Sequence, residues 1–162
     1  VPTPIINKGI RNIPFIKVFV IALIWSCIIV GIPFLNTSQL PQLNETFLLA
    51  LMSCFCFIVA ITLPFDIRDI NYDQREELKT IPQAFGIKGT IITALLFLMV
   101  SGILLGLAID SASQGIFYGY IATLVVLLFT NENRKELFYA GWVESTVIML
   151  WLGEIIDRLL LT

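Results

Sequence analysis

Three aspartates at a regular spacing are the residues of this sequence best suited to chemistry. Asp66, Asp69 and Asp73 stand at positions i, i+3 and i+7 of a polar stretch between two apolar runs. On a helix this spacing places three carboxylates on one face, where they repel one another unless a cation lies between them. Carboxylate oxygens suit Mg²⁺, which proteins commonly share with a substrate phosphate. One interpretation of the spacing is therefore a site for a hard divalent cation.

A purely structural interpretation explains part of the same pattern. Pro64 should kink or end the preceding helix. Asp66 and Asp69 could then lie in the first turn of a new helix, whose dipole stabilises carboxylates, but this does not explain Asp73, two turns further on. Arginines within the stretch could also neutralise the row, although exposed ion pairs contribute only about 0–1 kcal/mol. The residues alone leave both interpretations open.

The composition indicates that much of the protein surface faces a lipid bilayer. Of the 162 residues, 57% are hydrophobic and 14% are charged, and the mean hydropathy is +0.90. A soluble domain is about 45–50% apolar and about 25% charged, so the apolar excess is too large for one soluble core. The chain has no histidine, which excludes histidine-based triads and metal sites. It has no run of basic residues, and we expect no nucleic acid partner.

Five apolar runs predict five transmembrane helices, at about residues 14–35, 46–65, 87–109, 114–130 and 138–161. A span needs about 20 apolar residues to cross the hydrocarbon core. If five spans alternate in direction, nine of the ten lysines and arginines fall on the side that carries the polar loop 66–86. The positive-inside rule then places this aspartate loop in the cytoplasm. We expect a single-domain, all-α membrane protein in a bacterial cytoplasmic membrane.

Two pairs of glycines predict a close contact between the third and the fourth span. Gly102 and Gly106 lie in the third span, and Gly115 and Gly119 lie in the fourth. Small residues at this spacing allow membrane helices to approach closely. Since both pairs flank the same short turn, we expect one tight antiparallel hairpin.

The stretch that holds the aspartates resembles the second aspartate-rich motif of the UbiA superfamily of intramembrane prenyltransferases. Asp69 and Asp73 match its DxxxD core, and Asp66 matches an acid that many members carry upstream. The match continues downstream through Lys79, Thr80, Pro82 and Gly86. Glu76-Glu77 departs from the family, which often has a small and a basic residue at this place.

The resemblance covers nearly all of this chain but only about the second half of the family fold. The five spans resemble helices five to nine of the nine-helix UbiA bundle. The first aspartate motif of the family, of the NxxxDxxxD type, has no counterpart in residues 1–65. We therefore expect a C-terminal fragment or a truncated gene product, whose partner is the missing N-terminal half of the same fold.

The resemblance implies an enzyme of isoprenoid biosynthesis that uses Mg²⁺. Such an enzyme transfers an isoprenoid group from a prenyl diphosphate to an aromatic or lipid acceptor dissolved in the membrane. Asp69 and Asp73 would be catalytic and would bind Mg²⁺, with Asp66 as an auxiliary ligand. Lys79, and more weakly Arg75, would bind the diphosphate. The parent protein would be a prenyltransferase, whereas this chain alone should be inactive because half of the metal ligands are missing.

Two further charged residues lie at or within predicted spans. Glu144 lies about 9–10 Å into the fifth span at about 1.5 Å per residue, and an ionisable residue at such a depth is a functional hypothesis by default. It could face the acceptor cavity, or it could be a hydrogen-bonded packing residue. Lys17 stands at the start of the first span, where we expect an interfacial anchor rather than a diphosphate ligand.

Other functions stay open on the sequence alone. One alternative is a non-catalytic, orphan half-bundle that binds Mg²⁺ or diphosphate weakly or assembles with a partner. Another is a transporter-like integral membrane protein in which the aspartates line an acidic vestibule.

Overall fold

The computed structural model describes residues 15–35, 44–75, 79–109 and 114–160. These residues are mostly helical, with no β-strand among them, so the predicted all-α fold class is confirmed. The elements are α1 Ile16–Ser26, the π-helix η2 Cys27–Gly31, α2 Ile32–Leu35, α3 Glu45–Arg68, α4 Ile70–Arg75, α5 Ile81–Ala108, α6 Gln114–Leu128, the π-helix η3 Phe138–Val143 and α7 Glu144–Leu160.

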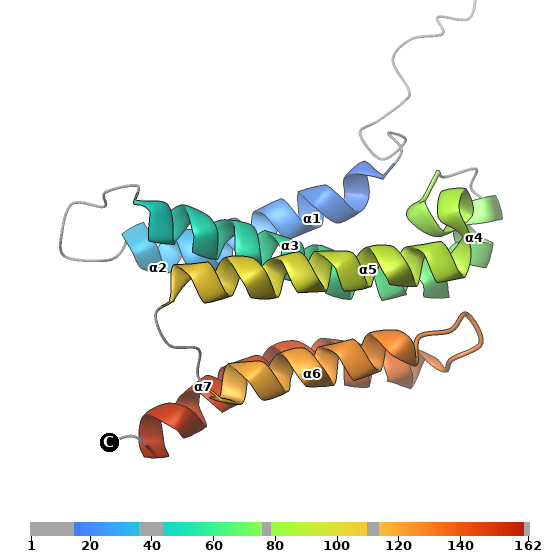
Figure 1. Cartoon of the computed structure of the whole chain (residues 1–162). Coiled ribbons are helices and arrows are strands. Elements are labelled where there is room, and N and C mark those ends of the chain that lie inside the picture. The colour runs from blue at the N-terminus through green and yellow to red at the C-terminus, as the bar shows by residue number, and fades with distance from the viewer. Residues whose placement is uncertain (1–14, 36–43, 76–78, 110–113, 161–162) are drawn as a thin grey trace, which may run out of the picture.

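The helices form two packed groups. α3 packs against α5 and α1, whereas α6 packs mainly against α7 (Figure 1). The start of α1, the short helix α4 and the turn between α6 and α7 lie at the same end of the molecule (Figure 1). Polar segments that are far apart in the sequence therefore gather at one end.

Three helical segments are long and apolar enough to cross a bilayer by length and composition: Ile16–Leu35, Glu45–Arg68 and Ile81–Ala108. The shortest has 20 residues, which corresponds to about 30 Å, the thickness of the hydrocarbon core. Gly115–Leu128 and Phe138–Leu150 are shorter apolar helices. The long helices indicate an integral membrane protein, and its division into five spans stays a prediction.

Small and β-branched side chains allow α1, α3 and α5 to approach one another. Val18 and Ala22 of α1, Val59 and Ala60 of α3 and Ala94 of α5 are at most 1% exposed. Large apolar side chains lie instead on the outer faces, and on α1 these include Leu23, Ile24 and Trp25. In a bilayer such outward side chains contact lipid, so their exposure costs little.

Hydroxyl groups connect three of the helices inside the apolar core. Ser53 Oγ of α3 donates to the carbonyl of Ser101 in α5 at 2.9 Å, and Ser101 Oγ lies 2.8 Å from the carbonyl of Ser53. Ser101 Oγ also lies 2.7 Å from the hydroxyl of Tyr120 in α6. Small residues and hydroxyl hydrogen bonds are the usual contacts between membrane helices, where the hydrophobic effect drives no association.

The glycine pair of α6 makes a different contact from the predicted one. A methyl group on Gly115 would overlap the backbone of Gly153 in α7, and one on Gly119 would overlap Leu150. On α5, Gly102 faces the ring of Tyr120, while a methyl group on Gly106 would meet nothing within 4 Å. The prediction of one tight α5–α6 hairpin was wrong, because the glycines of α6 allow a close approach to α7 instead.

Candidate functional site

The aspartate row lies where α3 ends and α4 begins. We expected the helix to kink or end at Pro64, and it does not end there, since α3 continues four residues further, to Arg68. Leu63, Pro64 and Ile67 are almost fully buried, and this packing stabilises the last turn despite the hydrogen bond that proline cannot donate. Asp66 consequently belongs to the last turn of α3 and caps no new helix.

The other two aspartates flank the junction between the helices. Asp69 follows the last residue of α3, and the amide of Asp73 in α4 donates to the Asp69 carbonyl at 2.9 Å. Asp66 is 2% exposed and Asp73 is 3% exposed, and both Asp69 and Asp73 interact electrostatically with Asp66. Buried carboxylates are costly unless cations or hydrogen-bond donors compensate their charge.

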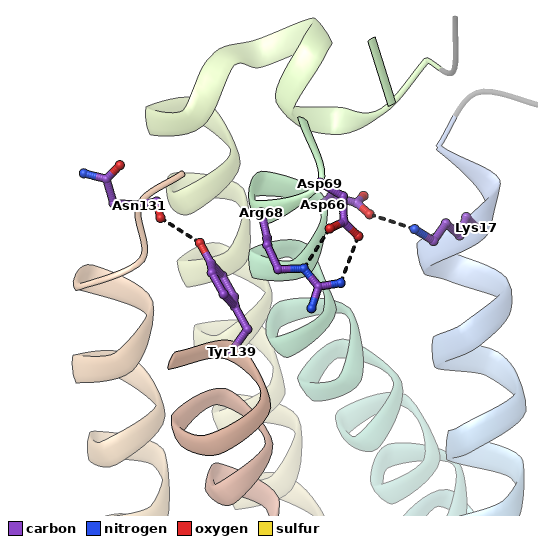
Figure 2. A network of polar contacts seen from close by, with 6 residues as sticks. All are labelled: Lys17, Asp66, Arg68, Asp69, Asn131 and Tyr139. Atoms are coloured by element: carbon purple, nitrogen blue, oxygen red, sulfur yellow. Dashed lines mark hydrogen bonds and ion pairs between the residues drawn. The ribbon is translucent and has the colours of Figure 1, made fainter. Parts of the chain in front are cut away.

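Lys17 of α1 supplies one such cation. Its Nζ lies 3.4 Å from Oδ1 of Asp66 (Figure 2). The Lys17 side chain is 55% exposed, whereas that of Asp66 is 3% exposed, so the ion pair lies at the edge of the bundle. We expected an interfacial anchor at this position, and the ion pair was missed. The only signal in the sequence was that Lys17 falls on the same predicted side of the membrane as the aspartates.

Arg68 neutralises Asp69 with a two-point contact. Its Nε donates to Oδ1 of Asp69 at 2.7 Å, and its Nη2 donates to Oδ2 at 3.0 Å (Figure 2). The expectation that an arginine of the stretch would partly neutralise the row is confirmed for Arg68. The guanidinium carbon also lies 5.3 Å from the ring centre of Phe65 and 5.9 Å from that of Tyr139.

The two residues predicted to bind diphosphate, Arg75 and Lys79, lie at the same end of the bundle as the aspartate row. Arg75 is the last residue of α4, and Lys79 precedes α5, with both residues exposed. The carbonyl of Lys79 accepts a hydrogen bond from the amide of Phe15 at 3.2 Å, which joins the start of α5 to the start of α1 and hence to Lys17. Glu76-Glu77, the departure from the family pattern, lies outside the described residues.

Two buried polar groups next to Lys79 have no hydrogen-bond partner within the described part of the chain. They are Oγ1 of Thr80 and Nε2 of Gln83. An unpaired buried polar group costs about 1–3 kcal/mol, so both groups suit a ligand with acceptor oxygens. Thr80 is part of the predicted motif, whereas Gln83 was missed. Its signal in the sequence is its position one helical turn after Thr80.

Glu144 stands apart from this cluster. It is the first residue of α7, directly after η3, and it is exposed. Its predicted place in an acceptor cavity stays a prediction.

A sequence model described as the UbiA prenyltransferase family matches residues 8–136. This range includes the whole aspartate row and most of the chain. The chain belongs to the UbiA prenyltransferase family. Searches of curated proteins and of solved structures found no match. The UbiA match ends before η3 and α7, so Tyr139 and Glu144 lie outside it.

The donors of this UbiA chain suit a hard cation that is shared with a phosphate. No group of three acidic, histidine or cysteine side chains is close enough to hold a metal ion among the described residues. Protein-bound Mg²⁺ needs only one or two carboxylates when substrate phosphates and water complete its shell. Asp69 and Asp73, one helical turn apart, can supply that number. The full predicted metal set of Asp66, Asp69 and Asp73 stays a prediction.

Proposed function

We propose that the protein containing this chain transfers an isoprenoid group from a prenyl diphosphate to an aromatic or lipid acceptor, using Mg²⁺. The observation that carries this proposal is the aspartate row at the polar end of α3, within the range that matches the UbiA prenyltransferase family. The low exposure of Asp66 and Asp73 supports it, since buried carboxylates without a catalytic or binding role are costly to retain.

The aspartate row and the residues near the start of α5 would bind the diphosphate together, the aspartates through Mg²⁺ and the basic residues directly. Asp69 and Asp73 would hold Mg²⁺, with Asp66 as an auxiliary ligand. Bound Mg²⁺ would neutralise the diphosphate and make it a better leaving group. Lys79, with Arg75 as a weaker candidate, would donate to diphosphate oxygens while the allylic C–O bond breaks and the bonding electrons leave with the diphosphate.

The rest of the fold would orient the two substrates. We propose that the isoprenoid tail lies among the membrane helices and that the aspartate end faces the cytoplasm of a bacterium. Glu144 would border the cavity of the acceptor, which forms the new bond to the prenyl carbon and loses a proton. We further propose that the five predicted spans form the C-terminal half of a nine-helix bundle. The 162-residue chain alone should then show no turnover, because the ligands of the first aspartate motif are absent.

An assay of the full-length protein tests the proposed function. The protein would be purified and supplied with a radiolabelled prenyl diphosphate and a panel of quinone precursors, other aromatic compounds and lipids, with Mg²⁺ or with EDTA. We expect a prenylated product from at least one acceptor in Mg²⁺ and none in EDTA. Turnover that is equal in EDTA would contradict the metal requirement.

The pairing of Asp66 with Lys17 and of Asp69 with Arg68 favours a second candidate function. Carboxylates whose charges are already neutralised could belong to a non-catalytic half-bundle or to a transporter-like protein. The same assay separates the candidates. A full-length protein that binds a prenyl diphosphate but yields no product with any acceptor would support the second candidate.

A further inference from the structure

Arg68 connects the aspartate row to the C-terminal pair of helices. Its guanidinium holds both carboxylate oxygens of Asp69, at 2.7 and 3.0 Å. The same guanidinium lies 5.9 Å from the ring centre of Tyr139 in η3 (Figure 2). η3 therefore lies beside the aspartate row through the guanidinium of Arg68.

Tyr139 is held firmly at this contact. It is fully buried, and its hydroxyl donates to the carbonyl of Asn131 at 2.7 Å. Its ring lies 6.0 Å from that of Phe65 of α3, and the guanidinium of Arg68 lies beside both rings. The residue belongs to a π-helical segment, a distortion that occurs frequently at functional sites.

We propose that Tyr139 is a positioning residue for the aspartate row. It holds the guanidinium of Arg68, and Arg68 in turn fixes the orientation of the Asp69 carboxylate. This inference rests on the proposed function, in which Asp69 binds a divalent cation together with diphosphate. Two lone-pair directions of Asp69 are taken by Arg68, and an ionised carboxylate has about four, so oxygen sites for a cation remain. The role of Tyr139 goes beyond the family match, which ends at residue 136.

Loss of a residue that orients a metal ligand typically reduces metal affinity by about 10- to 100-fold. Tyr139→Leu removes the ring that faces Arg68, and we expect about tenfold weaker binding of the cation. Tyr139→Phe keeps the ring and loses only the hydrogen bond to Asn131, so its affinity should stay within about twofold of wild type.

The test measures binding of Mn²⁺ in the presence of inorganic pyrophosphate to the purified full-length protein in detergent micelles. Electron paramagnetic resonance reports the concentration of free Mn²⁺, and circular dichroism during heating reports the fold separately. Phe138→Leu is the matched control, because Phe138 is the neighbouring aromatic residue and faces Arg134 at 5.5 Å. This control should leave the Mn²⁺ affinity unchanged.

A double substitution tests whether Tyr139 acts through Arg68. Arg68→Lys retains the positive charge but cannot hold both oxygens of Asp69, so it should weaken Mn²⁺ binding by about tenfold on its own. If Tyr139 acts through Arg68, adding Tyr139→Leu to Arg68→Lys should change the affinity no further.

The outcomes separate this inference from the proposed function. Wild-type full-length protein that binds no Mn²⁺ with pyrophosphate would overturn the proposed metal site and the inference with it. Wild-type binding with an unchanged affinity in Tyr139→Leu would overturn the role of Tyr139 alone. An additive effect of Tyr139→Leu in the Arg68→Lys background would also overturn it, since Tyr139 would then act independently of Arg68.

Discussion

At the residue scale, each of two aspartates in the row has its own basic partner. Lys17 lies against Asp66, and Arg68 lies against Asp69. The two pairs differ in setting, since Asp66 is buried whereas the Asp69 side chain is 31% exposed. The buried member depends more strongly on its partner, because a charge left alone in a protein interior is far more costly than one in water.

The Lys17–Asp66 pair leads to a prediction about stability. Lys17→Met leaves the Asp66 carboxylate buried without its cation, and we expect a loss of about 1–2 kcal/mol, below the value for a fully buried pair because Lys17 is half exposed. Unfolding by SDS in mixed micelles measures this loss. Lys88→Met, at an exposed position of α5, is the control and should change stability by at most about 0.5 kcal/mol. Equal effects of the two substitutions would show that the ion pair contributes nothing.

At the element scale, close packing of α6 on α7 depends on glycine. Gly115→Ala would push a methyl group into the backbone of Gly153, and we expect a loss of about 1–3 kcal/mol from overpacking. Gly106→Ala is the matched control in α5, where a methyl group meets nothing within 4 Å. There alanine should be neutral or stabilising by about 0.5–1 kcal/mol, as in other helix interiors. If Gly115→Ala is as well tolerated as Gly106→Ala, α6 and α7 do not pack closely at Gly115.

The ends of α3 give a prediction about orientation in the membrane. Tyr72 is exposed just beyond the aspartate end, and Glu45 is exposed at the opposite end of α3. In a background without native cysteines, Tyr72→Cys should react with a membrane-impermeant maleimide only after the cells are permeabilised. Glu45→Cys should react in intact cells. The reverse labelling pattern would refute the predicted cytoplasmic position of the aspartate row.

At the scale of the whole molecule, local patterns of the sequence were sufficient to predict the fold class. Continuous apolar runs and the spacing of the aspartates are visible without knowing any contact, and the all-α class and the family are both confirmed. Contacts between distant residues were not predictable in this way. The partner of Lys17 lies on another helix, as does the ring of Tyr139 beside Arg68. The glycines of α6 gave no sign of whether they face α5 or α7. The sequence left open whether α3 kinks or ends at Pro64, because the packing of Leu63 and Ile67 that accompanies its continuation to Arg68 is a tertiary contact.

The proposed function of the whole molecule depends most on the metal role of the aspartate row. The most direct measurement is prenyl-transfer turnover by the full-length protein with Asp69→Asn, Asp73→Asn or the control Glu45→Gln, an acid at the far end of α3. All three substitutions keep the size of the side chain and remove its charge, but only the two aspartate variants lose a carboxylate proposed to bind Mg²⁺. We predict at least about a hundredfold loss of turnover for both aspartate variants and wild-type turnover for Glu45→Gln. Wild-type turnover in Asp69→Asn or Asp73→Asn would contradict the proposed role of the row.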